Sequence, residues 1–354
     1  METEEERPSL LVVGCGGIGG VIAASLAEQG HRLTVVTRRP EVTEAIRLRG
    51  FELRDEVGAR QIRGEVELVE AIPERGAWDF VLLAVPPTSL AQVARAAAPL
   101  LGENGALVCF QNGLSEERLA PIVGAERVIG AVVAWGASSP EPGVFERTST
   151  GGFTLGRVDG AICERMQRLA RILEALGPVE LSVNLAGARW SKLALNCAVS
   201  SLGTLGGDTL GALLRHRFVR RLALEVMTEA VEVARAEGVK LEKVGGTIDL
   251  QWIALTGAER QGGNSPSMLA KHALLLAVGA RYRRLRSSML AAIERGREPG
   301  VDFLNGEVVA RAKRHGMSAP VNERVLASVH ALAKRQARSD LSTLRQIYDE
   351  TRAV

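Results

Sequence analysis

The chain has few of the residues that mark several common kinds of binding site. Its four cysteines lack the C-x-x-C spacing of a zinc site, so we expect no metal, and their apolar neighbours suit reduced thiols in a cytoplasm. Only four Trp and two Tyr are available for base stacking, and the net charge is +3 with the basic residues scattered. These features argue against nucleic acid or an acidic membrane as a partner. The cysteines are Cys15, Cys109, Cys163 and Cys197.

Long apolar runs are also missing. No uninterrupted run approaches the ~18 residues that a bilayer-spanning helix needs, and the acidic N-terminus from Met1 to Pro8 has no apolar signal core. We therefore expect a soluble, cytoplasmic protein with no membrane partner. The 354 residues are long for a single core, which favours two domains.

The first half of the chain alternates strand-like and helix-like stretches, which predicts a largely parallel sheet. From Arg127 to Arg157 the helices disappear, and Gly/Pro/Ser turns separate the strands, which suggests an antiparallel extension of that sheet. The strands expected here are 10–13, 32–37, 79–85, 106–110, 128–133, 144–148, 152–155 and 179–183, with short polar pieces between 51 and 69. The expected helices are 21–29, 41–49, 89–100 and 161–176.

Beyond about Asn184 the strand signals nearly vanish. The sequence therefore predicts an α/β Rossmann domain over residues 1–184 and an all-α domain over residues 185–354 that binds substrate and could pair with another copy. Periodic, Ala- and Leu-rich stretches cover 188–202, 218–237, 267–295, 302–315 and 322–338. A Gly/Asn/Ser/Pro-rich loop at 261–266 is a candidate lid.

A glycine-rich turn near the N-terminus carries the strongest chemical signal. The apolar strand from Leu10 to Val13 is followed by Gly14, Gly16 and Gly19 in G-x-G-x-x-G spacing, and then by a helical run. In this frame one glycine permits the tight turn, one lets the backbone approach a pyrophosphate, and one lets the helix pack on the strand. The stretch Gly14-Cys15-Gly16-Gly17-Ile18-Gly19 is thus a predicted dinucleotide-binding loop.

Arg38 decides which dinucleotide we expect. In a Rossmann unit, an Asp or Glu ending the second strand accepts a hydrogen bond from the adenosine ribose. This chain has Arg38 there, with Arg39 beside it. A guanidinium cannot accept that bond, but it pairs well with a 2′-phosphate, which favours NADP (NADPH) as the cofactor.

A second informative stretch runs from Ala188 to Leu202. Its polar residues Lys192, Asn196 and Ser200 are four apart, so in a helix they share one face. Polar groups on an otherwise apolar helix need partners, water or a ligand, because unpaired burial costs about 1–3 kcal/mol each. Lys192 is therefore a candidate general acid, while a lysine that reaches solvent along an amphipathic helix is the alternative.

These motifs, taken in order along the chain, resemble the ketopantoate reductase (2-dehydropantoate 2-reductase) family of pantothenate biosynthesis. The resemblance extends over nearly the whole sequence, and its most specific parts are the lysine motif and the Asp-x-x-Asn-Gly motif. The matching segments are Val12–Gly19, Arg38, Gln111-Asn112-Gly113, Trp190–Ala198, Ser287–Leu290, Val301–Gly306, Ala312–Gly316 and Ala319-Pro320.

The resemblance implies NADPH-dependent reduction of a 2-oxo acid between a Rossmann and a helical domain. It makes Lys192 the catalytic proton donor and places Asn112 beside nicotinamide and substrate. It also implies substrate contacts from Asn196 and Ser288, and a backbone contact of Gly136 with the cofactor. Ser200, which shares the helix face of Lys192 and Asn196, is a further candidate for substrate binding.

The chain departs from the family pattern at several positions. Pro86 stands where the family usually has a lysine, Ser200 replaces an asparagine, Ala292 an acidic residue and Gly300 a glutamate, and extra residues lie between about Lys243 and Arg286. Changing several polar partners should change substrate preference. A related reductase of another ketone or imine, and a non-catalytic NADPH-binding protein, therefore stay open as alternatives.

Overall fold

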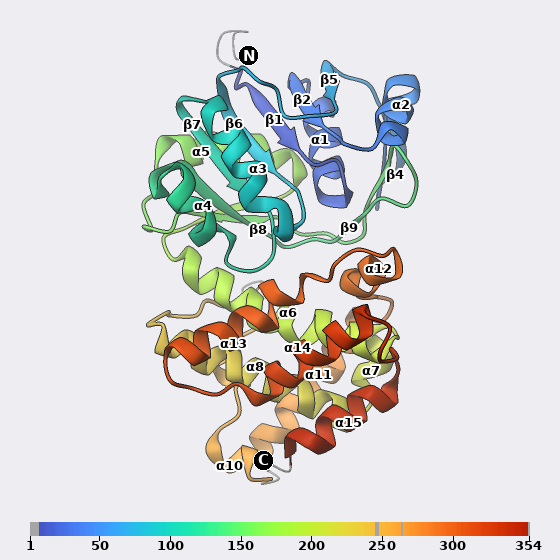
Figure 1. The fold of residues 1–354 in the computed structure, drawn as a ribbon, viewed down its shortest axis with the longest axis vertical. Helices are drawn as coiled ribbons and strands as arrows, with labels where there is room; N and C mark the ends of the chain where they lie inside the picture. Colours follow the sequence, from blue (N-terminus) through green and yellow to red (C-terminus); the bar gives the residue numbers. More distant parts are fainter. Residues whose placement is uncertain (1–6, 245–247, 263–264, 353–354) are drawn as a thin grey trace. The chain divides into compact units, whose positions relative to one another are not determined.

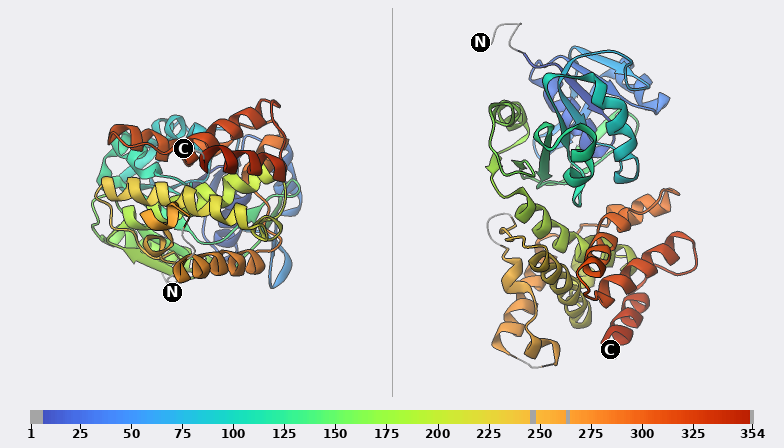
Figure 2. Two further views of the ribbon diagram at one scale, coloured as in Figure 1. Left: turned by 90° about the horizontal axis from the view of Figure 1, so that it is seen from below. Right: turned by 60° about the vertical axis from the view of Figure 1, so that its left-hand side comes forward.

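A computed structural model describes residues 7–244, 248–262 and 265–352. The chain divides into two compact units, Met1–Leu185 and Ala186–Val354. The boundary lies next to the composition change at Asn184. In both views of Figure 2 the blue-to-green half of the chain holds the sheets and the yellow-to-red half is helical.

An eight-stranded sheet forms the centre of the first unit (Figure 1). Its order is β12-β11-β8-β7-β6-β1-β2-β5, and all neighbouring strands are parallel except β8 and β11. The expected Rossmann sheet with an antiparallel extension is therefore present. Its strands are β1 (Leu10–Val13), β2 (Leu33–Val36), β5 (Val66–Val69), β6 (Trp78–Leu83), β7 (Leu101–Cys109), β8 (Val128–Val133), β11 (Phe153–Gly156) and β12 (Val179–Ser182).

Helices cover both faces of this sheet, which explains why its central strands are continuous apolar runs. Along β1, Leu10 and Val12 belong to one buried cluster, whereas Leu11 and Val13 belong to another. This alternation is the two-residue period of a strand. The helices of the unit are α1 (Gly17–Glu28), α2 (Pro40–Arg49), α3 (Leu90–Ala97), α4 (Ser115–Val123) and α5 (Glu164–Leu173).

The prediction for the first unit is wrong in two places. Val144–Arg147 does not extend the main sheet, because it pairs in parallel with Phe51–Asp55 in a second, four-stranded sheet. That sheet has the order β4-β3-β10-β9, with β3 (Phe51–Asp55), β4 (Gly58–Ile62), β9 (Ala137–Ser138) and β10 (Val144–Arg147). Helix α4 was not expected: Pro121 lies inside it, and proline is a helix-breaking signal in sequence.

The described part of the second unit is built of helices, as expected. Helix α8 packs against α7, α9, α11, α13, α14 and α15. The expected run over 267–295 is two helices, because the chain turns between Arg281 and Ser288 and Ser287 caps the second one. The helices are α6 (Leu185–Gly206), α7 (Leu210–Leu214), α8 (Arg217–Ala236), α9 (Leu250–Ile253), α10 (Gly257–Arg260), α11 (Pro266–Arg281), α12 (Ser288–Glu294), α13 (Asn305–Arg314), α14 (Pro320–Ala333) and α15 (Leu341–Arg352).

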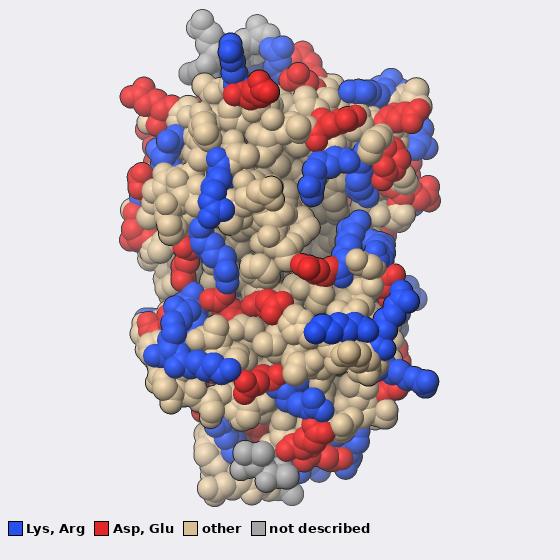
Figure 3. Space-filling model, viewed as in Figure 1, with Lys and Arg blue, Asp and Glu red and all other residues tan. Residues whose placement is uncertain are grey.

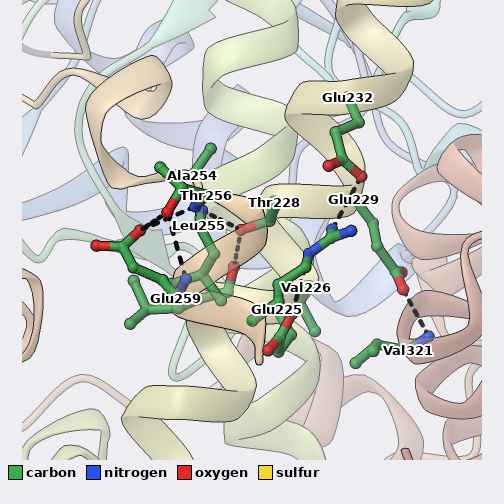
Figure 4. A network of polar contacts seen from close by, with 12 residues as sticks. Glu225, Val226, Thr228, Glu229, Glu232, Ala254, Leu255, Thr256, Glu259 and Val321 are labelled. Atoms are coloured by element: carbon green, nitrogen blue, oxygen red, sulfur yellow. Dashed lines mark hydrogen bonds and ion pairs between the residues drawn. The ribbon is translucent and has the colours of Figure 1, made fainter. Parts of the chain in front are cut away.

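A buried hydrogen bond holds Leu255 of the extra segment against α8 (Figure 4), and other polar contacts join Glu259 to Thr256 and Lys271. The Thr228 hydroxyl accepts a 2.8 Å hydrogen bond from the Leu255 amide, and Glu259 closes a capping box with Thr256. Glu259 also forms a 2.7 Å ion pair with Lys271, which is 2% exposed. The loop predicted as a lid lies partly outside the described residues, since 263 and 264 are not among them.

None of the described helices is long and apolar enough to cross a membrane. On the face drawn in Figure 3, basic and acidic side chains are interspersed.

Candidate active site

The glycine loop has the geometry that a dinucleotide needs. Gly14 has φ +101°, and a Cβ on it would lie 2.8 Å from the Ala84 carbonyl oxygen. A Cβ on Gly19 would overlap the Gly14 carbonyl oxygen, so α1 can pack this closely on β1 only with glycine there. Gly16 is different, because a Cβ on it would meet nothing within 4 Å. The first and third glycines are thus required by the fold, while the second leaves open space beside the backbone.

Gly16 also marks the start of α1, where backbone amides have no helical acceptors. Gly16 is the residue before the helix and has no side chain to cap it, and the first intrahelical bond joins the Gly20 amide to the Gly16 carbonyl. The amides of Gly17, Ile18 and Gly19 therefore lack helical acceptors, as at any helix start. Such a helix start binds phosphate through these amides and the helix dipole.

The loop is also tied to the end of β2, where Arg38, the predicted cofactor residue, and its neighbour Arg39 lie. The Gly14 amide donates to the Val36 carbonyl at 3.1 Å, and Arg39 Nη2 donates to the Cys15 carbonyl at 2.9 Å. Arg38 is exposed at the end of the same strand. Arg39 therefore braces the loop, a role that the sequence did not reveal, while the side chain of Arg38 is left toward solvent.

Cys15 contributes its backbone rather than its thiol. Burial raises the pKa of the Cys15 thiol to about 12, although nearby Arg39 lowers it. A buried, protonated thiol is chemically inert.

Asn112 lies at the same edge of the sheet. It follows β7, and the side chain of the preceding Gln111 donates to the carbonyls of Leu83 at 2.8 Å and Val85 at 2.9 Å. Gln111 therefore joins the ends of β6 and β7, and leaves Asn112 exposed beyond them. This carboxyl edge is where α/β proteins bind ligands, and the strand order reverses between β1 and β6, the strand next to β7.

Gly136 joins β8 to β9 near the start of α1. Its amide donates to Ser149 Oγ at 2.9 Å, and its carbonyl accepts from the Thr148 amide at 2.9 Å. The next residue packs on the glycine loop, since a Cβ on Gly17 would lie 2.9 Å from the Ala137 carbonyl oxygen. Because its own amide is already hydrogen-bonded, Gly136 would contact a cofactor by letting it approach the backbone closely, and not by donating a hydrogen bond.

Helix α6 carries three of the four predicted residues of the second unit. It is continuous over Leu185–Gly206, so Lys192, Asn196 and Ser200 do share one face, and all three are half-buried. The Asn196 amide nitrogen Nδ2 is buried without a hydrogen-bond partner among the described residues. A buried unpaired donor is costly, and a ligand oxygen would satisfy it.

Buried anchors hold α6 in place on either side of this face. Trp190 is 1% exposed and lies under the Arg311 guanidinium at 5.6 Å, and Ser191 Oγ donates to the Glu242 carbonyl at 2.6 Å. Further along, the side chain of Asn305 donates to the Cys197 carbonyl at 3.3 Å. Asn305 of the Asp-x-x-Asn-Gly motif is itself fully buried, and it therefore helps to hold α6 in position through its backbone.

A buried carboxylate completes this support. Asn305 Nδ2 donates to Asn322 Oδ1 at 2.9 Å, and Asn322 Nδ2 donates to Glu229 at 2.7 Å. Glu229 also accepts from the Val321 amide (Figure 4). Burial raises the pKa of Glu229, and the bonds from Asn322 and Val321 lower it. These residues position α6 rather than react.

Ser287 brings Ser288 to the far end of the predicted face. Ser287 Oγ donates to the Ser200 carbonyl at 2.8 Å and also caps α12 by accepting from the Leu290 amide at 3.4 Å. Ser288 is the next residue and is exposed. The sequence pattern drew attention to Ser288, and the structure adds Ser287 as its anchor.

Three positions at which the chain departs from the family pattern have apolar residues or glycine. Pro86 opens the turn after β6, where its carbonyl accepts from the Ser89 amide and hydroxyl, each at 3.1 Å. Ala292 lies in α12, and Gly300 starts a short turn before α13. None of the three has a polar side chain.

The predicted residues thus form two groups, one in each unit. Gly14–Gly19, Arg38, Asn112 and Gly136 belong to the first, and Lys192, Asn196, Ser200 and Ser288 to the second. Among the described residues, no three His, Cys, Asp or Glu side chains come together to hold a metal.

Two family profiles match this chain. The profile "Ketopantoate reductase PanE/ApbA" matches residues 10–160, and "Ketopantoate reductase PanE/ApbA C terminal" matches residues 184–333. The chain belongs to the ketopantoate reductase family. The fold and the oxidoreductase class expected from the sequence motifs are therefore confirmed.

Curated relatives and solved structures agree with this membership over nearly their full length. The chain is 27% identical over 346 residues to a 2-dehydropantoate 2-reductase of Mesorhizobium japonicum, covering 92% of this chain and 97% of that protein. It is also 27% identical to the uncharacterized oxidoreductase YkpB of Bacillus subtilis, covering 90% and 97%.

Among solved structures, a PanE/ApbA family ketopantoate reductase from Ralstonia eutropha aligns with a TM-score of 0.75 and 27% identity, covering 92% of this chain and 99% of that one. A D-mandelate dehydrogenase with NADH and anilino(oxo)acetate aligns with a TM-score of 0.75 at 17% identity, covering 93% and 100%. At that identity the likeness concerns the fold alone.

Proposed function

We propose that this protein reduces a 2-oxo acid to a 2-hydroxy acid with NADPH, and that 2-dehydropantoate (ketopantoate) is the first substrate to test. Family membership supports the reaction class. The observation that carries the proposal is the face of α6 with Lys192, Asn196 and Ser200, where one buried amide donor has no partner within the described chain.

The glycine loop fits a dinucleotide, because a Cβ on Gly16 would meet no atom within 4 Å and the next three amides begin a helix without helical acceptors. Gly14–Gly19 would hold the pyrophosphate, and Arg38 would pair with the 2′-phosphate that distinguishes NADPH from NADH. When bound, NADPH supplies the hydride for the carbonyl carbon. Asn112 and Gly136, at the same edge of the sheet, would border the nicotinamide end.

The residues of α6 would act on the substrate. We propose that Lys192 donates a proton to the carbonyl oxygen as negative charge develops there, since a cationic acid stabilises that charge most in the transition state. Asn196 would donate from Nδ2 to a substrate oxygen, and Ser200 and Ser288 would contact the carboxylate or its substituent.

A second candidate function keeps the reaction and changes the substrate. The family usually has polar side chains at three positions where this chain has none, which are Pro86, Ala292 and Gly300. The preferred substrate would then be a ketone other than ketopantoate, or an imine formed from a ketone and an amine. A non-catalytic NADPH-binding protein is the remaining alternative.

One assay distinguishes these readings. NADPH oxidation is followed with the purified protein over a panel of 2-oxo acids that includes ketopantoate, with and without amines. We expect turnover with ketopantoate that Lys192→Ala slows about 10²- to 10⁴-fold and that the exposed-lysine control Lys334→Ala retains. Turnover only with another oxo acid, or only with amines, favours the second candidate; tight NADPH binding without any turnover favours the non-catalytic protein.

A further inference from the structure

Helix α11 has an exposed face that is entirely apolar. It belongs to the extra segment between about Lys243 and Arg286, to which the proposed reaction gives no role. Leu269 is 61% exposed and Leu276 is 46% exposed. Side chains at this spacing lie along one side of a helix, and a helix of a globular protein normally turns such a side toward the core. The exposed side chains between 269 and 280 are Leu269, Ala270, Ala273, Leu276, Ala277 and Ala280.

The opposite side of α11 is fixed to the second unit, so the helix cannot roll to bury this face. Lys271 is buried and forms the 2.7 Å ion pair with Glu259, and Leu275 is buried as well. A Cβ on Gly279 would lie 3.0 Å from the Cβ of Leu214, which shows how closely α11 packs on α7. Rolling the helix would break these contacts and leave the Lys271 charge unpaired.

A strongly basic run directly follows the apolar face. Its four arginine side chains are exposed, and no ion pair or side-chain hydrogen bond joins any of them to another described residue. Tyr282 and Leu285 lie between them and are 42% and 43% exposed. The arginines are Arg281, Arg283, Arg284 and Arg286.

The chemistry of this surface limits what can cover it. The stretch from Pro266 to Arg286 contains no Asp or Glu. A second copy of the chain that paired through the same face would therefore bring like charge and no counter-charge. Nucleic acid would supply phosphates but no apolar layer for the leucines. An acidic lipid surface supplies both, because its phosphates attract arginine and its acyl chains accept leucine.

We propose that the outer face of α11 and the arginine run after it bind the surface of an anionic lipid bilayer. The helix would lie in the plane of the headgroups, with Leu269 and Leu276 reaching the acyl boundary and the arginines among the lipid phosphates. The net charge of +3 argues against such a partner as an average over the whole chain, whereas this surface concentrates positive charge. The contact is peripheral, since none of the described helices is long and apolar enough to cross a membrane.

Vesicle sedimentation of the full-length protein tests the proposal. The probe is vesicles of phosphatidylcholine mixed with phosphatidylserine, and vesicles of phosphatidylcholine alone are the comparison. We expect at least tenfold tighter binding to the anionic vesicles. Raising the salt from about 0.1 M to about 1 M shortens the Debye length from about 10 Å to about 3 Å, so it should weaken that binding severalfold.

A triple arginine variant tests the electrostatic part. Each arginine near an anionic surface contributes about fivefold in affinity, so Arg283→Gln with Arg284→Gln and Arg286→Gln should weaken binding at least tenfold. The matched control removes the same charge from exposed arginines of the first unit and should stay within twofold. It consists of Arg75→Gln, Arg95→Gln and Arg171→Gln.

A double leucine variant tests the apolar part. Leu269→Gln with Leu276→Gln should weaken binding at least fivefold at unchanged charge. The control Leu48→Gln with Val57→Gln changes two apolar side chains of the first unit that are 67% and 86% exposed, and should have no effect. Thermal unfolding checks that each variant is folded.

Tryptophan fluorescence gives a readout that does not depend on losing affinity. The new ring in Leu276→Trp should be quenched by vesicles that contain brominated acyl chains, whereas the new ring in Leu48→Trp should not. Equal binding to neutral and anionic vesicles, equal weakening by variant and control, or an unquenched Leu276→Trp would overturn the proposal.

Two further outcomes would assign the surface to another partner and also overturn it. One is binding of polyglutamate without binding of anionic vesicles, which indicates an acidic protein segment. The other is a dimer in analytical ultracentrifugation that Leu269→Gln with Leu276→Gln dissociates, which indicates a second copy of the chain.

Discussion

The hydroxyl of Ser287 donates a 2.8 Å hydrogen bond to the carbonyl of Ser200, and so joins the start of α12 to the face of α6 that carries Lys192 and Asn196. The same hydroxyl caps α12. One side chain thus fixes both the helix start and the position of Ser288.

Ser287→Ala should therefore affect both stability and substrate binding. Loss of a serine cap costs about 1 kcal/mol, and we expect KM for the 2-oxo acid to rise severalfold with a smaller change in kcat. Urea unfolding and steady-state kinetics measure the two effects. Ser265→Ala is the matched control, because Ser265 caps α11 in the same way, through the Met268 amide at 3.1 Å. A rise in KM as large in Ser265→Ala as in Ser287→Ala would contradict a local role.

Gly19 and Gly16 of the loop should respond differently to substitution by alanine. Gly19→Ala places a methyl group against the Gly14 carbonyl, so it should destabilise the first unit by about 1–3 kcal/mol or prevent folding. Gly16→Ala should change stability by less than about 0.5 kcal/mol, because its φ of −94° is ordinary and its Cβ meets no atom within 4 Å.

Gly16→Glu should fold as well as Gly16→Ala and yet lose NADPH binding, since a carboxylate would then occupy the place proposed for the pyrophosphate. Thermal unfolding and fluorescence titration of NADPH check the pair. Undiminished NADPH affinity in Gly16→Glu would show that the cofactor binds elsewhere.

Arg38 should set the preference between the two nicotinamide cofactors. Removing a charged partner of a phosphate costs about 1.5–3 kcal/mol, so Arg38→Asp should weaken NADPH about ten- to hundredfold and leave NADH almost unchanged. Arg39→Ala, which loses the bond to the Cys15 carbonyl, should weaken both cofactors alike. Equal affinity of the unmutated protein for NADPH and NADH would contradict the assignment.

The two arginines also show what the sequence could and could not reveal. The spacing of glycines and the end of the second strand identify both positions, because strand, turn and helix are local patterns. The packing between β1 and β2 determines that Arg38 faces solvent and that Arg39 bonds the loop. A local sequence pattern does not predict this difference.

Other features were not predicted because they too depend on contacts between distant parts of the chain. Val144–Arg147 is a strand, as expected, but its partner is Phe51–Asp55, about ninety residues earlier, and sequence distance hides such pairing. Helix α4 is not among the expected helices, and it holds Pro121 as well as an acidic first turn, so its local signals conflict. Ser287 and Asn305 act through bonds to carbonyls of α6, which only the folded chain brings within reach.

Because of the buried pair of Lys271 and Glu259, the free energy of unfolding should depend on pH in the acidic range. Burial raises the pKa of Glu259, but hydrogen bonds from Lys271, Thr256 and Ser267 outweigh it and bring the pKa from 4.5 to about 2. A lowered folded-state pKa stabilises the protein above pH 4.5, and this contribution is lost as pH falls from 4.5 toward 2. Urea unfolding across that range should show the loss.

Breaking the pair at neutral pH gives the matched test. Lys271→Met leaves a buried carboxylate unpaired and should destabilise by about 3–5 kcal/mol, and Lys271→Met with Glu259→Gln should recover much of that. Lys313→Met, whose 3.0 Å pair with Glu323 is exposed, should cost less than about 1 kcal/mol. A similar cost for both lysines would contradict the importance of burial.

The central claim is that hydride passes from NADPH to a 2-oxo acid while Lys192 supplies the proton. The most direct measurement uses NADPH deuterated at the transferring position of C4, with ketopantoate as substrate, and mass spectrometry of the product. The account predicts pantoate with one deuterium at C2, formed about 10²- to 10⁴-fold more slowly by Lys192→Ala, the range for loss of a general acid. Pantoate without deuterium, or an unchanged rate in Lys192→Ala, would contradict it.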